Sequence, residues 1–251
     1  MASVLSFKAV AQDPSSLVEK GADSGWEVVV VRPNDPANAY GGYQWEGRDV
    51  LIRRETVQSM LLFAYALNQS QLENVPDWAK TELWDAKGHA GGADHLSRDQ
   101  MQSLIRKLLA ERFGLVMHMV HRVASVYMLT VAKGGATMAA STRDPNGLSS
   151  ESDRENGGLE TIHAENMTIG ELSELLMRIA LDHPAVDMTD LRGRYDFDLG
   201  WTTDDALASA APDAPPGLFM AIQEQIGLRL EAVKAMADVL VIDKVERPKT
   251  N

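Results

Sequence analysis

The chain contains no cysteine among its 251 residues. Disulfide bridges, cysteine-based zinc sites and thiol nucleophiles are therefore excluded. No apolar run approaches the roughly 18 residues that a membrane-spanning helix needs, so we expect no membrane span. Basic residues are also few: 24 Lys and Arg stand against 36 Asp and Glu, which gives a formal net charge of −12. Because phosphate contacts require clustered basic side chains, we expect no nucleic-acid partner.

The motifs of the common catalytic classes are missing as well. The sequence has no glycine-rich phosphate loop, no nucleophile-elbow serine and no His-Glu-x-x-His zinc helix. Convergent active sites need no sequence motif, so these absences weaken the case for an enzyme without excluding one.

What the sequence does contain is one order of elements used twice. Thr56 and Thr168 each precede a helix whose apolar residues recur at helical spacing, and Gly114 and Gly227 each end a later helix. The number of residues from the threonine, which can cap the helix, to the glycine is nearly equal in the two halves (114 − 56 = 58; 227 − 168 = 59). We therefore predict an α+β fold made of two similar β-α-β-α-β-β units, an internal repeat.

Each glycine is followed by two β-rich stretches, which we interpret as a hairpin. In the first half these are residues 115–122 and 126–131, and in the second half 228–231 and 239–242. The second strand begins the same distance past the glycine in both copies (126 − 114 = 12; 239 − 227 = 12). We expect antiparallel or mixed sheets, each covered by two helices.

Four segments follow from this pattern. Residues 1–25 are predicted to be a disordered N-terminus or the remnant of a secretory signal, because an Ala-x-Ala sequence follows a short apolar run. Residues 26–135 form the first unit, 136–157 a linker or mobile loop, and 158–248 the second unit. One body is favoured over two separate lobes, because each half is near the size at which a single core is marginal.

The first candidate site is rich in histidine. His and Asp side chains could hold a divalent metal, although we expect no cofactor. Two of the histidines are three residues apart on a predicted strand and therefore point to opposite faces. We favour the interpretation that these histidines are scattered over the surface. If there is a metal site, its candidate ligands are His89, Asp94, His95, His118 and His121.

The second candidate site holds carboxylates and an arginine that could perform acid–base chemistry if the chain is an enzyme. A purely structural explanation is favoured. Polar and apolar residues alternate as on a half-exposed strand, and an Asp-Thr turn and an Arg–Asp pair would account for the remaining residues. The catalytic candidates are His118, Asp187, Arg194 and Asp196.

The third candidate site is aromatic. Rings at loop and strand ends suit a surface that binds peptide or glycan, although packing in the core of a small sheet is the commoner role. The ligand-binding candidates are Tyr43, Trp45, Trp84 and Trp201.

Three motifs connect these residues to a known family: Trp26-Glu27-Val28 with Arg32-Pro33-Asn34, Gly193-Arg194-Tyr195-Asp196-Phe197, and Gln223-Glu224-Gln225-Ile226-Gly227-Leu228. With them the chain resembles the soil-associated protein family of unknown function (DUF3738), abundant in Acidobacteria. The resemblance implies a periplasmic or extracellular protein, sometimes linked to a membrane metallopeptidase of the BlaR type, and no established activity. A cytoplasmic location stays open. The small units also resemble the short N-terminal domains of secretins and TonB receptors, which bind partner proteins, a likeness of fold alone.

We therefore predict an exported soluble binding or interaction module, with a sensory role as one form. Its ligand would be a protein, a peptide or a small molecule. The alternative is a hydrolase, with or without a metal, that uses a His/Asp site in the cleft between the two units.

Overall fold

The computed structural model describes residues 25–37, 40–92, 95–145, 147–208 and 214–248, so the predicted N-terminal segment lies almost wholly outside it. In these parts of the chain the fold is α+β, as the sequence predicts, and it contains three four-stranded sheets. The described residues form two compact units: unit 1 comprises those up to Ala124 and from Ala235 onward, and unit 2 comprises those from Ser125 to Lys234.

Unit 1 contains a sheet with the strand order β1-β5-β3-β2. Its strands are β1 (Trp26–Pro33), β2 (Gly42–Glu46), β3 (Asp49–Glu55) and β5 (Trp84–Ala90). The helices α1 (Val57–Tyr65) and α3 (Arg98–Phe113) share one hydrophobic core with this sheet. Smaller elements lie between them: η1 (Gln69–Gln71), β4 (Leu72–Glu73) and α2 (Asp77–Thr81).

Unit 2 is built on the same plan, with the strand order β7-β11-β9-β8. Its strands are β7 (Ala139–Ala140), β8 (Ser150–Asn156), β9 (Leu159–Met167) and β11 (Tyr195–Thr202). The helices α4 (Ile169–Ile179) and α6 (Leu218–Gln225) complete a second, separate core. The short elements are β10 (Ala185–Asp187) and α5 (Asp204–Leu207).

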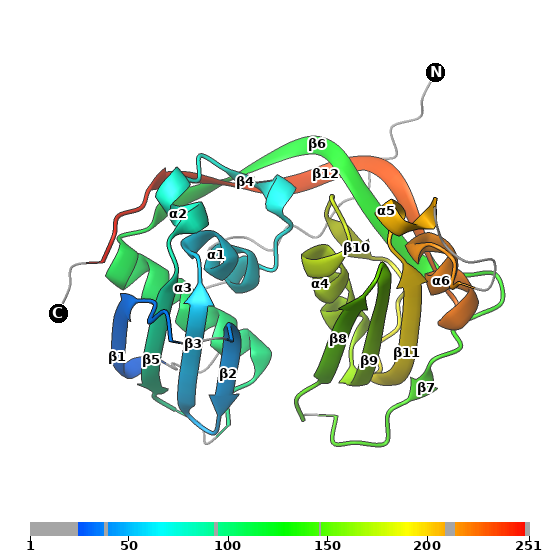
Figure 1. The fold of residues 1–251 in the computed structure, drawn as a ribbon, viewed down its shortest axis with the longest axis horizontal. Coiled ribbons are helices and arrows are strands. Elements are labelled where there is room, and N and C mark those ends of the chain that lie inside the picture. Colours follow the sequence, from blue (N-terminus) through cyan, green and yellow to red (C-terminus); the bar gives the residue numbers. More distant parts are fainter. Residues whose placement is uncertain (1–24, 38–39, 93–94, 146, 209–213, 249–251) are drawn as a thin grey trace. The chain divides into compact units, whose positions relative to one another are not determined.

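The third sheet has the order β10-β6-β12-β4 and runs through both units. The predicted hairpins are wrong: β6 is one strand, Val116–Val131, and β12 is one strand, Leu228–Lys244 (Figure 1). The two strands lie side by side and run in opposite directions, since Ala132 N–H donates to Gly227 O at one end and His121 contacts Asp238 further along. No Gly, Pro or Asn occurs in the middle of either strand, so neither contains the Asn-Gly, Asp-Gly or Gly-Gly pair that favours a tight hairpin turn.

The internal repeat is visible in the strand register. A shift of 113 residues carries one cap glycine onto the other (227 − 114 = 113). The same shift carries Leu72 onto Ala185 and Tyr127 onto Leu240. Leu72 pairs in parallel with Leu240, and Ala185 pairs in parallel with Tyr127. The β4–β12 contact of one copy thus matches the β10–β6 contact of the other.

The helix ends confirm the predicted signals. The Thr168 hydroxyl accepts from the Glu171 N–H, and the Glu171 carboxylate accepts in return from the Thr168 N–H. This capping box supplies acceptors for two N–H groups that the helix leaves unpaired. Gly114 and Gly227 both have a positive φ, at 58° and 69°. A left-handed conformation is what a glycine at a helix end provides without strain.

Segment 136–157, predicted as a linker or mobile loop, instead contains β8, which pairs antiparallel with β9 along its whole length. Every residue of β8 is exposed, and four of its seven residues carry a charge. An edge strand of this kind lacks the alternating apolar residues that reveal most strands in a sequence, while its charges discourage pairing with other chains.

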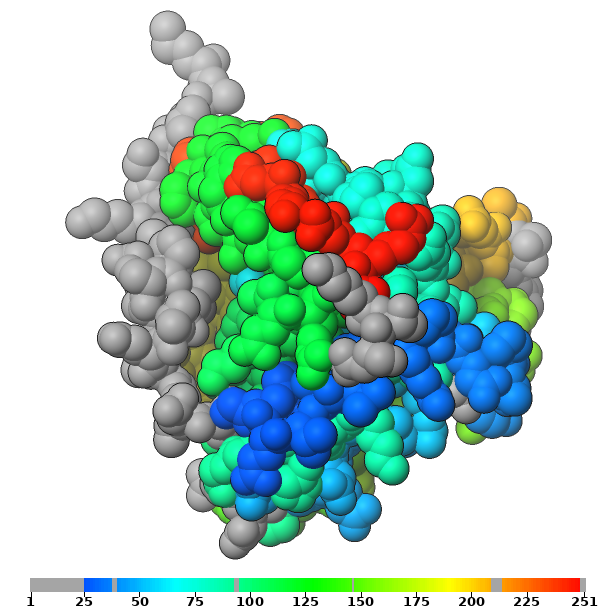
Figure 2. Space-filling model, turned by 90° about the vertical axis from the view of Figure 1, so that its left-hand side faces the viewer, coloured from blue at the N-terminus to red at the C-terminus, as the bar shows by residue number. Residues whose placement is uncertain are grey.

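The two units therefore differ from the continuous segments 26–135 and 158–248 that the sequence predicts. The second half of β12 belongs to unit 1, where Leu240 and Ile242 join the core of residues from the first half of the chain. Figure 2 shows the C-terminal end, in red, lying against the green segments of the same unit, where Glu246 N–H donates to Phe113 O at 2.7 Å.

Candidate functional site

Both units hold a bulged strand in place with an aspartate. Arg54 near the end of β3 and Asn166 near the end of β9 have positive φ values of 51° and 55°. The Arg54 N–H donates to Asp85 at 3.1 Å, and the Asn166 N–H donates to Asp196 at 2.7 Å. The ladder to the neighbouring strand is irregular at both places. Asp196, a catalytic candidate, thus has a counterpart in unit 1 with the same structural role.

Hydrogen bonds set the protonation state of both aspartates. The Asn166 N–H, followed by the Ser141 hydroxyl, lowers the pKa of Asp196. Burial by itself would raise the pKa of Asp85, but donors from Asn34, Arg54 and a second backbone N–H outweigh that effect, so its pKa is lowered. Both groups are therefore held as carboxylates, which suits an acceptor of hydrogen bonds better than a proton donor.

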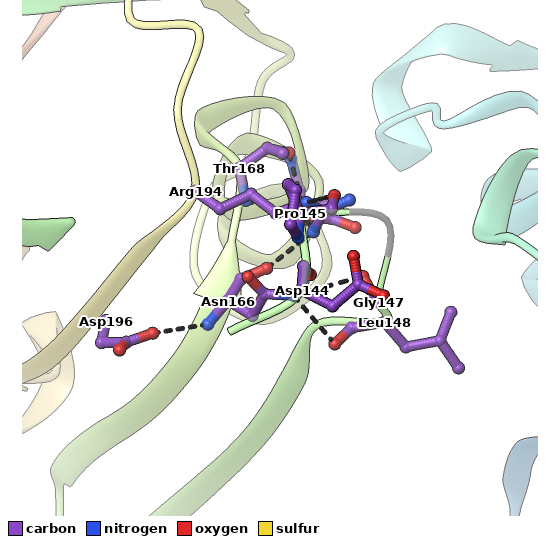
Figure 3. A network of polar contacts seen from close by, with 9 residues as sticks. Asp144, Pro145, Gly147, Leu148, Asn166, Thr168, Arg194 and Asp196 are labelled. Atoms are coloured by element: carbon purple, nitrogen blue, oxygen red, sulfur yellow. Dashed lines mark hydrogen bonds and ion pairs between the residues drawn. The ribbon is translucent and has the colours of Figure 1, made fainter. Parts of the chain in front are cut away.

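Arg194 is held in the same network, which is drawn in Figure 3. Its guanidinium donates to Pro145 O at 2.7 Å and Asn166 O at 2.6 Å, and it lies 3.3 Å from the Glu171 carboxylate. The Asn166 amide donates to Asp144 O at 2.9 Å and to Gly147 O at 3.2 Å. These contacts fasten the loop before β8 to β9 and β11.

The remaining catalytic candidates lie elsewhere. Asp187 accepts from the Thr189 N–H at 2.9 Å and from its hydroxyl at 2.7 Å, which is the Asp-Thr turn that the sequence indicates. His118 lies in unit 1 and contacts Asp243 at 2.9 Å, with about half of each side chain exposed. Three of the four candidates therefore make contacts that stabilise unit 2, and the fourth forms a surface pair.

The metal candidates that the structure describes do not form a cluster. His89 contacts Asp49 at 2.8 Å, and His121 contacts Asp238. His95 is exposed, and Asp94 lies outside the described residues. Among the residues that the structure describes, no three His, Cys, Asp or Glu side chains are placed to hold a metal ion.

Two of the aromatic candidates are core residues. Trp84 is 6% exposed and belongs to the core of unit 1, and Trp201 is 3% exposed and belongs to that of unit 2. The Trp84 ring packs edge-on against Phe113, with ring centroids 5.5 Å apart. Tyr43 and Trp45, in contrast, are only half-buried at the β2 edge of the sheet.

Tyr43 and Trp45 belong to a larger surface with Phe63 and Arg98, which we call the aromatic–arginine surface. Tyr43 stacks on Phe63 with ring centroids 4.2 Å apart and an interplanar angle of 15°. The Arg98 guanidinium carbon lies 5.1 Å from the centre of the Phe63 ring, within the range of a cation–π contact. The Trp45 indole N–H donates to Leu96 O at 3.1 Å, which fixes its ring.

The local sequence explains how these side chains come together. Tyr43 and Trp45 are two residues apart on a strand, so both point to the face that carries the core. Register places them opposite Ile52 and Val50, which are both buried. The Tyr43 hydroxyl lies 3.3 Å from the Glu55 carboxylate, which holds the ring at the edge of the sheet.

A second contact between an arginine and an aromatic ring joins the same two helices, α1 and α3. The Arg106 guanidinium carbon is 5.7 Å from the centre of the Tyr65 ring. Burial raises the pKa of Tyr65, and the positive charge of Arg106 partly offsets this effect. Tyr65 therefore remains a neutral phenol at physiological pH.

The aromatic–arginine surface is not repeated in unit 2. Ile52 faces Tyr43 across the β2–β3 pair, and its counterpart Ala164 faces Glu151 across β8–β9. Phe63 corresponds to Leu175 (175 − 63 = 112, as for the two capping threonines, 168 − 56 = 112). Residues that the shared scaffold needs occur in both units. Because the aromatic–arginine surface occurs in unit 1 alone, the scaffold does not explain it, and it is a candidate for a function.

The sequence offered Tyr43 and Trp45 as candidates, but not Phe63 and Arg98, which lie beside them in the structure. Phe63 occupies a core position of an amphipathic helix, and Arg98 is one of 24 basic residues. Only a comparison of corresponding positions in the two halves could have shown that these residues differ between the units.

Fold and site together define a class of protein: two similar α+β units joined by long paired strands, with an aromatic surface on one of them. No helix among the described residues is long and apolar enough to span a membrane. The chain belongs to the family described as "Protein of unknown function (DUF3738)", which it matches over residues 58–245. Neither the curated proteins nor the solved structures include a significant match to the chain.

Proposed function

We propose that the protein is a binding module whose ligand contacts the aromatic–arginine surface of unit 1. One observation carries the proposal: Tyr43, Phe63 and Arg98 form a stacked, half-buried cluster in one unit, while the same positions of the other unit hold no ring. The shared fold does not require rings at these positions, because unit 2 builds the same strand order with Glu151 and Leu175 there.

The chemistry of the surface suggests what it binds. Stacked rings supply rigid apolar area at a low cost in side-chain entropy, and a guanidinium supplies planar donors for a carboxylate. The ligand class that fits is an aromatic group with an adjacent carboxylate, as in a peptide that ends in an aromatic residue.

The contacts of the catalytic candidates support a binding role over the hydrolase alternative. Asp187, Arg194 and Asp196 are each engaged in hydrogen bonds that hold turns and bulges of unit 2. Asp196 shares its role with Asp85, which is the pattern of a scaffold residue.

The test uses N-acetylphenylalanine, which carries a ring and a free carboxylate, in an NMR titration of the full chain. We expect saturable shift changes centred on Tyr43, Phe63 and Arg98. In the Arg98→Gln variant, affinity should fall by about threefold to tenfold, the usual effect of losing one exposed charge-assisted contact. N-acetylphenylalanine amide, which lacks the carboxylate, should bind the wild type correspondingly more weakly.

Tyr195→Leu is the matched control for Tyr43→Leu. Both tyrosines are half-buried and pack against the core of their unit. Tyr43→Leu should abolish the saturable shifts, and Tyr195→Leu should leave them intact. Shifts that map to unit 2, or that respond equally to both variants, would refute the proposal.

We also propose that the protein is exported, with a functional link to a membrane metallopeptidase. The Ala-x-Ala sequence near the N-terminus and the resemblance of the chain to an exported family support this proposal. Cell fractionation with N-terminal sequencing of the mature protein tests it. Recovery of the intact N-terminus from the cytoplasm alone would contradict it.

A further inference from the structure

Unit 2 contains an aromatic cluster of its own, which the candidates predicted from the sequence do not include. Tyr127, in β6, lies next to Phe219 of α6, with ring centroids 5.3 Å apart and planes at 71°. Its other neighbour is His183, with centroids 6.0 Å apart. The Tyr127 hydroxyl donates to the Asp182 carboxylate at 2.9 Å. We call these four residues the tyrosine–carboxylate cluster.

Backbone contacts fix the position of the cluster. The Tyr127 N–H donates to Pro184 O at 2.7 Å, just before β10 pairs with β6. The loop that carries Asp182 and His183 is therefore anchored beside the Tyr127 ring. Phe219 comes from the first turn of α6, a different part of the chain.

The cluster is exposed and negatively charged. Phe219 is 45% exposed, a high value for a phenylalanine, and the Asp182 side chain is 74% exposed. Within the described part of the chain, Asp182 has an imidazole neighbour at 3.8 Å but no Lys or Arg partner. Burial, the hydrogen bond to Asp182, and the charges of Asp182 and Asp204 all raise the pKa of Tyr127. Two carboxylates thus act on one ring.

The shared scaffold does not require this arrangement. The shift of 113 residues carries Leu240 onto Tyr127 and Arg106 onto Phe219, so unit 1 has an aliphatic and a basic residue at these positions. Like the aromatic–arginine surface, the cluster occurs in one unit only. Its charge, however, is of the opposite sign.

We propose that the tyrosine–carboxylate cluster binds an organic cation, specifically a quaternary or methylated ammonium group. Aromatic faces attract such a cation through their quadrupole, and a carboxylate beside them completes the complementary charge. A weakly hydrated ammonium favours rings over bulk water more than a metal ion does. The site is distinct from the aromatic–arginine surface and does not depend on its function.

The probe is choline, titrated against the full-length protein and followed by the NMR signals of aromatic side chains and backbone amides. Its uncharged isostere, 3,3-dimethyl-1-butanol, is the matched control ligand. We expect saturable choline-dependent shifts at Tyr127, His183 and Phe219. The alcohol should bind at least about fivefold more weakly, the scale of a partly exposed cation–π site.

Two variants and one control locate the site. Asp182→Asn and Phe219→Leu should each weaken choline binding by about threefold to tenfold. Asp190→Asn removes another exposed carboxylate of unit 2, whose side chain is 96% exposed and lies 3.8 Å from Arg192, and it should have no effect. Equal binding of the alcohol, equal loss in Asp190→Asn, shifts centred elsewhere or no saturable binding would each overturn the proposal. Unchanged amide spectra of the free variants establish that they are folded.

Discussion

Asp85 offers the sharpest test of the structural account, because three donors converge on one buried carboxylate. Asn34 Nδ2 lies at 2.9 Å, the Arg54 N–H at 3.1 Å and the Asp35 N–H at 3.3 Å from its oxygens. Asp85 itself is 4% exposed. A hydrogen bond to a charged group is worth about 1.5–3 kcal/mol, and such bonds to one acceptor do not add fully.

We expect Asp85→Ala to lower the free energy of unfolding by about 3–5 kcal/mol, because it leaves the donors without an acceptor. Asp85→Asn retains one oxygen but turns an amide N–H₂ toward another donor, and it should cost about 2–3 kcal/mol. Asp49→Asn is the control, since Asp49 is exposed in the neighbouring strand, and we expect a change within about 0.5 kcal/mol. Urea unfolding followed by tryptophan fluorescence measures all three values.

The loss of unfolding free energy in Asp85→Asn should depend on pH. The folded pKa of Asp85 lies below its ordinary value, so the carboxylate stabilises the fold above the pKa of the unfolded chain. That stabilisation is lost as pH falls from the unfolded pKa through the folded one. The difference between wild type and Asp85→Asn should therefore shrink in acid. An equal difference at neutral and acidic pH, or a loss no larger than that of Asp49→Asn, would refute the reasoning.

Three further predictions concern unit 2. Gly227→Ala should cost at least about 3 kcal/mol in urea unfolding, because φ is +69° and the new Cβ would lie 2.1 Å from a backbone oxygen; a small effect would contradict the close approach. Thr168→Ala should cost about 1 kcal/mol by removing the hydroxyl that caps α4, and an unchanged midpoint of thermal unfolding would rule out that role. The hydrogen bond to Asp198 raises the pKa of His163 in the folded protein. The pair therefore contributes its full stabilisation below the His163 pKa of the unfolded chain, and this contribution is lost as pH rises through the His163 pKa of the folded protein. NMR titration should show a lower His163 pKa in Asp198→Asn, and an unchanged value would exclude the pair as the cause.

Local signals in the sequence predicted the four longer helices, α1, α3, α4 and α6, while the short helices α2 and α5 were interpreted as loops. Capping boxes, amphipathic spacing and a terminal glycine act within a few residues of one another, so Thr168, Gly114 and Gly227 could be interpreted from the sequence alone. The repeat was visible for the same reason, because the spacing of these local signals along the chain does not depend on tertiary contacts.

The sequence did not reveal which strands pair. Residues 115–131 are predicted as a hairpin although His121 to Ser125 contains no Gly, Pro or Asn. The partner of β6 lies about a hundred residues further along the chain in β12, and periodicity carries no information on such a distance. β8 was missed because an edge strand exposed on both faces shows no apolar alternation.

Of the site residues, those with local partners were interpreted correctly and those with distant partners were not. The turn between Asp187 and Thr189 spans two residues and could be predicted. The contact between Asn166 and Asp196 crosses two strands, as does the matching contact in unit 1. Tyr127 and Phe219 are 92 residues apart (219 − 127 = 92), and neither belongs to a motif.

The path of β12 also sets an order of events during synthesis. The ribosome releases residues 25–124 before the end of β12, yet the core that these residues form includes Leu240 and Ile242. Unit 2, by contrast, is one continuous stretch that is complete once residue 234 has emerged. Unit 1, most of which is translated before unit 2, therefore finishes folding after it. A stop codon at position 240 would leave the apolar interior of unit 1 open to chaperones and proteases.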